Sequence, residues 1–151
     1  MAVERTLILV KGDAVARGLV GEIIARYERR GYTILGTKMM QVSQEQARQH
    51  YAEHTEKPFF GELVRNITSS VLVAMVLEGE NAIEACRATN GVTDPIKATP
   101  GTIRGDYGQT LARNLVHASD SPQAGEREVA IFFRDDELFP RPHPLAAWMK
   151  E

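Results

Sequence analysis

The sequence is poor in cysteine and in net charge, and each shortage excludes a class of protein. A single cysteine, Cys86, among 151 residues rules out a disulfide within the chain and so a disulfide-stabilised scaffold. Lys and Arg total 18 against 20 Asp and Glu, and the formal net charge of −2 gives no general attraction for polyanions. We therefore expect nucleic acid not to be a main partner, and any anionic ligand to be met by a local cluster of cations.

Long apolar runs are also missing. The apolar segment near the N-terminus, residues 7–10, is too short for a signal sequence or a membrane-spanning helix. Together with the single cysteine, this favours a cytoplasmic protein with no membrane partner. Hydrophobic residues make up 43% of the chain and charged residues 25%, the usual balance of a globular protein, and this length suffices for one core. We expect residues 1–151 to form a single domain.

Periodicity along the chain predicts four strands separated by helices. Compact apolar runs indicate strands at 6–11, 32–42, 71–77 and 129–133, of which the third should be central in the sheet. An apolar stripe predicts one helix that begins near Asp13 and ends at Gly31. Further helices are expected from Ser43 to about 54, at 61–67, at 80–89 and from 121 onward. This order is typical of an α/β (α+β) ferredoxin-like sandwich, a four-stranded antiparallel sheet with helices packed on it.

One short motif favours a metal site. His50-Tyr51-Ala52-Glu53-His54 matches H-x-x-E-H, in which two histidines on one helix face hold zinc. Three specified positions arise often by chance, and no obvious helix with a third ligand follows. Histidines on a polar helix are therefore the better interpretation, and a zinc hydrolase stays an alternative.

Three cations lie at ends of elements or in the long segment 90–121, namely Lys11, Arg87 and Arg104. Each has a structural explanation by itself: an edge charge, a partner for a helix C-terminus, and an ion pair with Asp106. Taken together they indicate a polyphosphate site. Such a site would rely on side-chain cations, because the chain contains no glycine-rich phosphate loop of the Walker type.

His117 is the candidate nucleophile. It is expected in a loop, beside Asn114, Ser119 and Asp120, with Glu128 shortly downstream. Imidazole accepts a phosphoryl group when one ring nitrogen is free and unprotonated, and a carboxylate on the other nitrogen fixes that tautomer. A lone histidine is more often structural, so the neighbouring polar residues carry this hypothesis.

The segment Asn114-x-x-His117-Ala118-Ser119-Asp120 resembles the signature of the nucleoside diphosphate kinase family, N-x-x-H-[small]-S-D. Other segments resemble the family in the same order, and together they cover essentially residues 4–134. They are 4–6 with Lys11, 13–15, 51–54, 58–60, 73–79, 93–95 and 100–106.

The resemblance implies a ferredoxin-like fold and a ping-pong kinase. A nucleoside triphosphate would give its γ-phosphoryl group to Nδ1 of His117, and a nucleoside diphosphate would collect it. Glu128, aided by Ser119, would orient the ring through Nε2. Mg²⁺ is the implied cofactor, held mainly by the nucleotide phosphates, with no protein residue as a direct ligand.

The resemblance also implies a nucleotide-binding set. Lys11, also counted as catalytic, would hold the phosphates with Arg87, Thr93 and Arg104, while Tyr51 and His54 line the phosphate end and Asn114 contacts sugar and phosphate. Phe59 would stack on the base beside Leu63 and Leu111. Stacking tolerates any base, which predicts broad base specificity.

Three positions depart from the family pattern. Gly12 stands in place of the usual Pro, Ser70-Val71 in place of Gly-Pro, and Asp94 in place of Asn. We expect a looser turn at Lys11, a negative charge near the site, and modestly lower affinity or activity. A catalytically weak nucleotide-binding relative is therefore the alternative. The segment 148–151 resembles the longer tails of hexameric members, so a homo-oligomer is expected, with a hexamer favoured over a tetramer.

Overall fold

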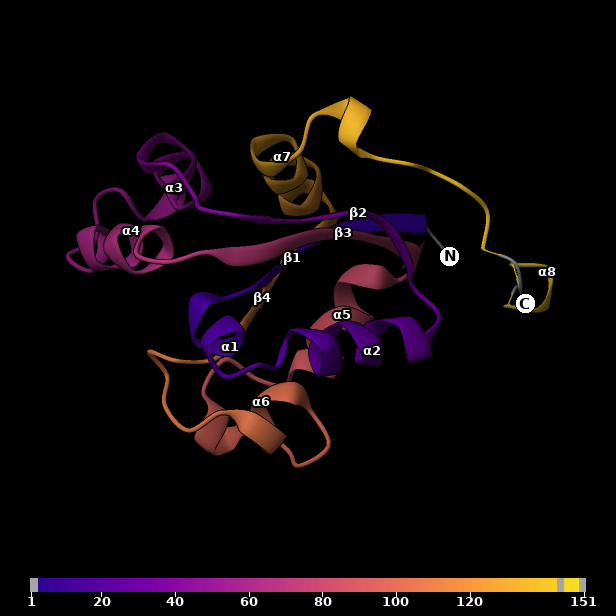
Figure 1. Ribbon diagram of the computed structural model, residues 1–151, viewed down its shortest axis with the longest axis horizontal. Helices are drawn as coiled ribbons and strands as arrows, with labels where there is room; N and C mark the ends of the chain where they lie inside the picture. Colours follow the sequence, from indigo (N-terminus) through magenta and orange to yellow (C-terminus); the bar gives the residue numbers. More distant parts are fainter. Residues whose placement is uncertain (1–2, 144–145, 150–151) are drawn as a thin grey trace.

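The computed structural model of the protein describes residues 3–143 and 146–149. Its centre is an antiparallel sheet of four strands in the order β2-β3-β1-β4, as Figure 1 shows. The strands are β1 (Val3–Val10), β2 (Thr33–Met40), β3 (Leu72–Glu80) and β4 (Val116–Ala118). The predicted ferredoxin-like sandwich is confirmed, and β3 lies inside the sheet as its apolar sequence indicated.

Helices occupy most of the remaining chain. The α-helices are α1 (Gly12–Ala16), α2 (Val20–Arg30), α3 (Gln44–His50), α4 (Phe60–Thr68), α5 (Ala82–Asn90), α6 (Ile103–Tyr107), α7 (Pro122–Phe132) and α8 (Ala146–Met149). Three short 3₁₀ helices are η1 (Ala52–His54), η2 (Pro95–Lys97) and η3 (Asp135–Glu137). Within the described residues, no helix has both the length and the apolar character needed to cross a membrane.

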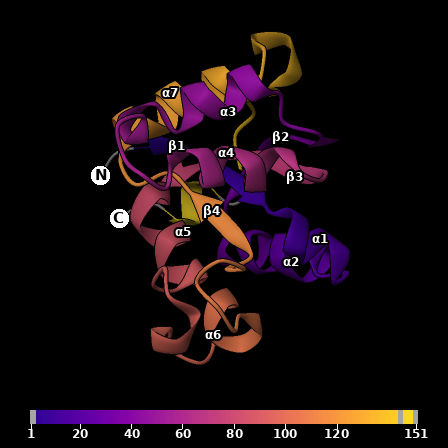
Figure 2. The same cartoon turned by 90° about the vertical axis from the view of Figure 1, so that its left-hand side faces the viewer.

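The sheet is covered on both faces, so its central strands are apolar on both sides. Leu7 and Leu9 of β1 join one core with α3, α4 and α7. Ile8 and Val10 of the same strand join a second core with α2 and α5, because successive side chains point to opposite faces. Figures 1 and 2 show α3 and α7 on one side of the sheet and α2, α5 and α6 on the other.

Helix ends were predicted well where a specific capping residue is present. Ser43 caps α3 with a complete capping box to Gln46, and Gly31 ends α2 in the left-handed conformation with φ of 102°.

The single helix expected from Asp13 to Gly31 is wrong. It is two helices, α1 and α2, interrupted near Gly18, whose φ of 70° leaves the helical region. Lys11, not Asp13, is the N-cap of α1.

The strand predicted at 129–133 is also wrong, because these residues form the last turns of α7 and the residue after it. Gly125, Glu128, Val129 and Phe132 are buried with helical spacing, and a short apolar run alone does not distinguish a helix from a strand. The fourth strand is instead β4, which contains His117 and lies inside the segment expected to be a loop. Similarly, Glu80 ends β3, so the helix expected from residue 80 begins at Ala82.

Helix α7 lies very close to β1. A Cβ added at Gly125 would lie 2.3 Å from the backbone oxygen of Arg5. Glycine therefore allows an approach that no other residue permits, and this approach places Glu128, one turn further along α7, beside β4.

Candidate active site

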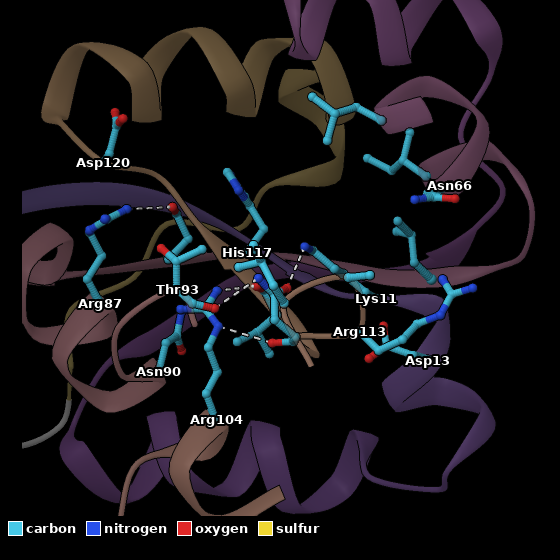
Figure 3. Close-up of a pocket in the computed structure, with 18 of the residues that line it drawn as sticks. Lys11, Asp13, Asn66, Arg87, Asn90, Thr93, Arg104, Arg113, His117 and Asp120 are labelled. Atoms are coloured by element: carbon cyan, nitrogen blue, oxygen red, sulfur yellow. Dashed lines mark hydrogen bonds between the residues drawn. The ribbon is translucent and has the colours of Figure 1, made fainter. Parts of the chain in front are cut away.

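A cavity of about 1220 Å³ opens beside the ends of β1 and β4 and is lined by the predicted site residues. All of the predicted nucleotide-binding residues line it, as do His117 and Glu128, although they come from elements far apart in the sequence. Figure 3 shows Lys11, Arg87 and Arg104 arranged around His117. Ser119 is the exception, since it is fully buried and lies behind Glu128.

Strand β4 carries His117, and α7 supplies its carboxylate partner. Nε2 of His117 lies 2.8 Å from Oε1 of Glu128, and the hydroxyl of Ser119 donates to the same oxygen at 2.8 Å. Burial disfavours the charge of Glu128, but the hydrogen bonds from His117 and Ser119 outweigh burial and lower the pKa of this carboxyl. An ionised carboxylate only accepts hydrogen bonds, so Nε2 carries the proton and Nδ1 of the neutral ring has the free lone pair.

Ser119 holds this arrangement to the sheet. Its Oγ also accepts from the backbone N–H of Leu7 at 3.0 Å, where β4 has already ended. One hydroxyl therefore bonds both a buried backbone N–H of β1 and the buried carboxylate of Glu128. These two bonds fix Glu128 relative to β1, the strand that pairs with β4.

Lys11 follows β1 and reaches Asn114, with 2.8 Å between its Nζ and Oδ1 of the amide. Burial, with a contribution from Arg104, lowers the pKa of Lys11 to about 8. Phosphate would favour the charged form again.

Leu115, between Asn114 and β4, is buried with a φ of 76°, a strained conformation for a leucine. Its N–H donates to the carboxylate of Asp13 at 3.1 Å and its carbonyl accepts from the N–H of Lys11 at 2.9 Å. These bonds tie the turn before His117 to the turn that carries Lys11.

Arg104 is buried and clamps three backbone carbonyls. It donates to Asn114 at 3.1 Å, to Gly91 at 2.7 Å and to Val116 at 2.6 Å. Burial lowers its pKa, although a guanidinium stays charged at neutral pH. The alternative of an ion pair with Asp106 is wrong, because Asp106 pairs with Arg26 at 2.8 Å.

The remaining predicted residues lie around the opening. Arg87 and Thr93 are exposed on one side, and the amide of Asn114 donates to the carbonyl of Thr93 at 3.3 Å. Phe59 and Leu111, with 45% and 59% of their surface exposed, present apolar faces with the half-buried Leu63. Tyr51 is half-buried, and burial raises its pKa to about 12, so it remains a neutral hydroxyl.

The two histidines of the H-x-x-E-H motif separate in the structure. Nδ1 of His54 lies 2.9 Å from Nζ of Lys57, whereas His50 is buried against His117, with 4.7 Å between ring centroids. They therefore do not form the zinc pair that the motif indicated. The family resemblance missed His50, together with Arg113, which also lines the cavity. The motif was the only signal for His50, and it pointed to the wrong partner.

The departures from the family pattern have local explanations. Asp94 does not line the cavity, and its carboxylate accepts from the N–H of Ile96 at 3.1 Å as the cap of η2. A Cβ at Gly12 would lie 2.0 Å from Oγ of Ser70, so the departures at positions 12 and 70 are neighbours in the structure. The turn at Lys11, next to them, is held by the hydrogen bond from the Lys11 N–H to the carbonyl of Leu115.

The fold is a ferredoxin-like sandwich, and its cavity holds an oriented imidazole surrounded by cations. This arrangement is suited to an enzyme that transfers a group from an anionic ligand. Comparison with known proteins makes this specific. The family model described as nucleoside diphosphate kinase matches residues 4–138. The nucleoside diphosphate kinase of Pelotomaculum thermopropionicum is 55% identical, covering 98% of this chain and 99% of the relative. That of Archaeoglobus fulgidus is 58% identical, covering 89% of each chain.

Solved structures agree with these relatives. A halophilic nucleoside diphosphate kinase from Halobacterium salinarum, solved in complex with CDP, superposes with a TM-score of 0.94 at 49% identity, covering 99% of this chain and 100% of that one. The chain belongs to the nucleoside diphosphate kinase family, and it is a nucleotide-binding phosphotransferase.

Proposed function

We propose that the protein transfers the γ-phosphoryl group of a nucleoside triphosphate to a nucleoside diphosphate through a phosphohistidine at His117. The observation that carries this proposal is the hydrogen bond between Nε2 of His117 and Oε1 of Glu128, which leaves the lone pair of Nδ1 free. Nδ1 attacks the γ-phosphorus, the bond to the bridging β–γ oxygen breaks, and the diphosphate leaves. A second diphosphate then attacks the phosphohistidine and restores the free ring.

Side-chain cations stabilise the charge on the transferring group. Lys11, Arg87 and Arg104 line the cavity with Thr93. Within the described residues, three of the five N–H groups of Arg104 donate to backbone carbonyls, which leaves two donors for phosphate. Tyr51 and His54 complete the phosphate end, and Asn114 would contact sugar and phosphate. Stacking on Phe59 beside Leu63 and Leu111 contributes on the order of 1–3 kcal/mol without reading base edges, which supports broad base specificity.

Mg²⁺ fits the cavity as a cation bound by the nucleotide. One oxygen of Asp13 accepts from the Leu115 N–H, and one oxygen of Glu128 bonds to His117, so both carboxylates already have protein partners. Mg²⁺ commonly binds substrate phosphates and water with few protein ligands, and it would neutralise phosphate charge here.

Labelling separates this proposal from a nucleotide-binding relative with little activity. The protein is incubated with γ-labelled ATP and Mg²⁺, split into acid-treated and alkali-treated halves, and then given unlabelled GDP. We expect an acid-labile, alkali-stable label that moves to GTP and is absent from His117→Ala. Nucleotide binding without any label on the wild-type protein would support the non-catalytic alternative instead.

We also propose that one domain spans the chain, that it works in the cytoplasm, and that it assembles as a homo-oligomer, a hexamer ahead of a tetramer. Exposed apolar side chains outside the cavity support an assembly, among them Met39, Ile96 and Phe139, with 61%, 76% and 66% of their surface exposed. Sedimentation equilibrium tests the number of subunits, and a monomer at micromolar concentration would contradict the assembly.

A further inference from the structure

His50 is a buried histidine that the proposed phosphoryl transfer does not use. It ends α3 with 4% of its surface exposed, and its ring meets those of His117 and Phe132 edge-on, at centroid distances of 4.7 and 5.4 Å. Nδ1 of His50 has no hydrogen-bond partner in the described part of the chain. A buried polar atom without a partner costs free energy, so it requires an explanation.

His50, His117 and Glu128 form a cluster with the donors of a transition-metal site. One ligand atom from each residue lies within 4.8 Å of the others, and this is the one such group of His, Cys, Asp or Glu within residues 3–143 and 146–149. Two imidazole nitrogens and a carboxylate suit Zn²⁺, which accepts nitrogen and oxygen ligands, whereas Mg²⁺ requires an octahedron of oxygens. The cavity supplies room for water as a fourth ligand.

We propose that His50, His117 and Glu128 bind Zn²⁺, or a divalent cation of similar chemistry, and that this binding inhibits phosphorylation of His117. Tetrahedral bonds of about 2.0–2.2 Å place ligand atoms roughly 3.5 Å apart. Nε2 of His117 and Oε1 of Glu128 need to separate slightly from 2.8 Å, and the His50 ring needs to move toward them.

Inhibition follows from the tautomer of His117, and this step rests on the proposed function. In the free protein Nε2 carries the proton and Nδ1 the lone pair. A metal on Nε2 takes the lone pair of that nitrogen, so the proton of the neutral ring moves to Nδ1 and no net proton is released. Nδ1 then has no lone pair for the γ-phosphorus. The metal thus blocks the nucleophile without occupying the phosphate site.

Calorimetric titration of Zn²⁺ into the nucleotide-free protein tests the site without reference to activity. We expect one ion per chain, with an affinity reduced at least about tenfold in His50→Phe and in Glu128→Gln. Phenylalanine retains the aromatic contacts, and Glu128→Gln provides a second variant if His50→Phe folds poorly. His54→Gln is the matched control: it removes the other histidine of the H-x-x-E-H motif and should change the affinity by less than about twofold.

Two results would overturn the site: no stoichiometric binding to the wild-type protein, or equal affinity in His50→Phe. Nitrogen NMR of the imidazoles then tests the tautomer, which is practicable with 4 histidines. The signal of Nδ1 in His117 should change to that of a protonated nitrogen when Zn²⁺ binds, and an unprotonated Nδ1 would refute the inhibitory mechanism.

Labelling with γ-labelled ATP and Mg²⁺ gives the functional readout. Zn²⁺ should slow labelling of the wild-type protein more than that of His50→Phe, and chelation of Zn²⁺ by ATP is the same in both samples. Equal slowing in both proteins would reject inhibition through this site. If neither protein is labelled without Zn²⁺, the proposed function fails, whereas the calorimetric result still decides whether the metal site exists.

Discussion

Replacement of Ser119 by alanine tests whether one hydroxyl holds the candidate active site to the sheet. The substitution removes a 2.8 Å bond to the ionised Glu128 and leaves the N–H of Leu7 unpaired, since the Oγ of Ser119 accepts from it at 3.0 Å. A hydrogen bond to a charged group contributes about 1.5–3 kcal/mol, and an unpaired buried donor costs about 1–3 kcal/mol. The two losses share one atom and are not additive, so we expect the free energy of unfolding to fall by about 3 kcal/mol.

For a chain of this length, about 3 kcal/mol corresponds to a melting temperature lower by roughly 6–12 °C. Urea unfolding and calorimetry at one fixed protein concentration measure the effect, because assembly makes stability depend on concentration. Ser69→Ala is the matched control. Among the residues that the structure describes, the Oγ of the exposed Ser69 bonds only the carbonyl of Asn66, and the loss of this hydroxyl should change stability by less than about 0.5 kcal/mol. A Ser119→Ala protein as stable as this control would refute the reasoning.

Three further predictions concern charge and backbone packing near the site. Because the pKa of Lys11 is lowered to about 8, this side chain loses its charge as the pH rises through 8, and kcat/KM for nucleotide should fall over the same range. Lys11→Arg should abolish this fall at high pH, and a fall that persists in the variant would show that another group causes it. Gly125→Ala should destabilise the protein by about 1–3 kcal/mol, because the added Cβ would lie 2.3 Å from a backbone oxygen. Gly21→Ala should stabilise it by about 0.5–1 kcal/mol, because Gly21 lies in α2 with open space around it. Urea unfolding midpoints that move in the same direction for both variants would contradict this contrast. Gly12→Pro should stabilise the protein by about 0.4–1 kcal/mol only when it is combined with Ser70→Gly. Lys11 already has ψ of 164°, which suits a following proline, but the Oγ of Ser70 lies where the carbons of the proline ring would be. A double-mutant cycle in which the two substitutions have independent effects on stability would contradict this prediction.

Local signals in the sequence determined most of the secondary structure and the identity of the site residues. The capping box at Ser43 and the glycine at position 31 act through bonds and dihedral angles within a few residues, so they could be read directly. The segment 114–120 likewise carries its chemistry in adjacent residues, and the family resemblance supplied distant partners such as Lys11 and Glu128. The structure brings both to the cavity of His117.

Tertiary packing decided what local signals could not distinguish. Residues 129–133 are apolar enough for a strand, but α7 is helical because Gly125 lets it approach β1 and bury Val129 and Phe132 with helical spacing. Strand β4 is short and exists through its pairing with Ile8, Leu9 and Val10, contacts more than 100 residues away along the chain. No local propensity reveals a partner at that distance.

The surroundings of His117 show the same division between sequence and tertiary structure. The sequence determined that an imidazole, a carboxylate and a set of cations are present, because those residue types alone provide the chemistry. Only the folded chain decided that Ser119 bonds Leu7 and Glu128 together, and that His50 lies against His117 instead of pairing with His54. Burial and hydrogen-bond partners depend on which elements pack together, and that packing is a property of the whole chain.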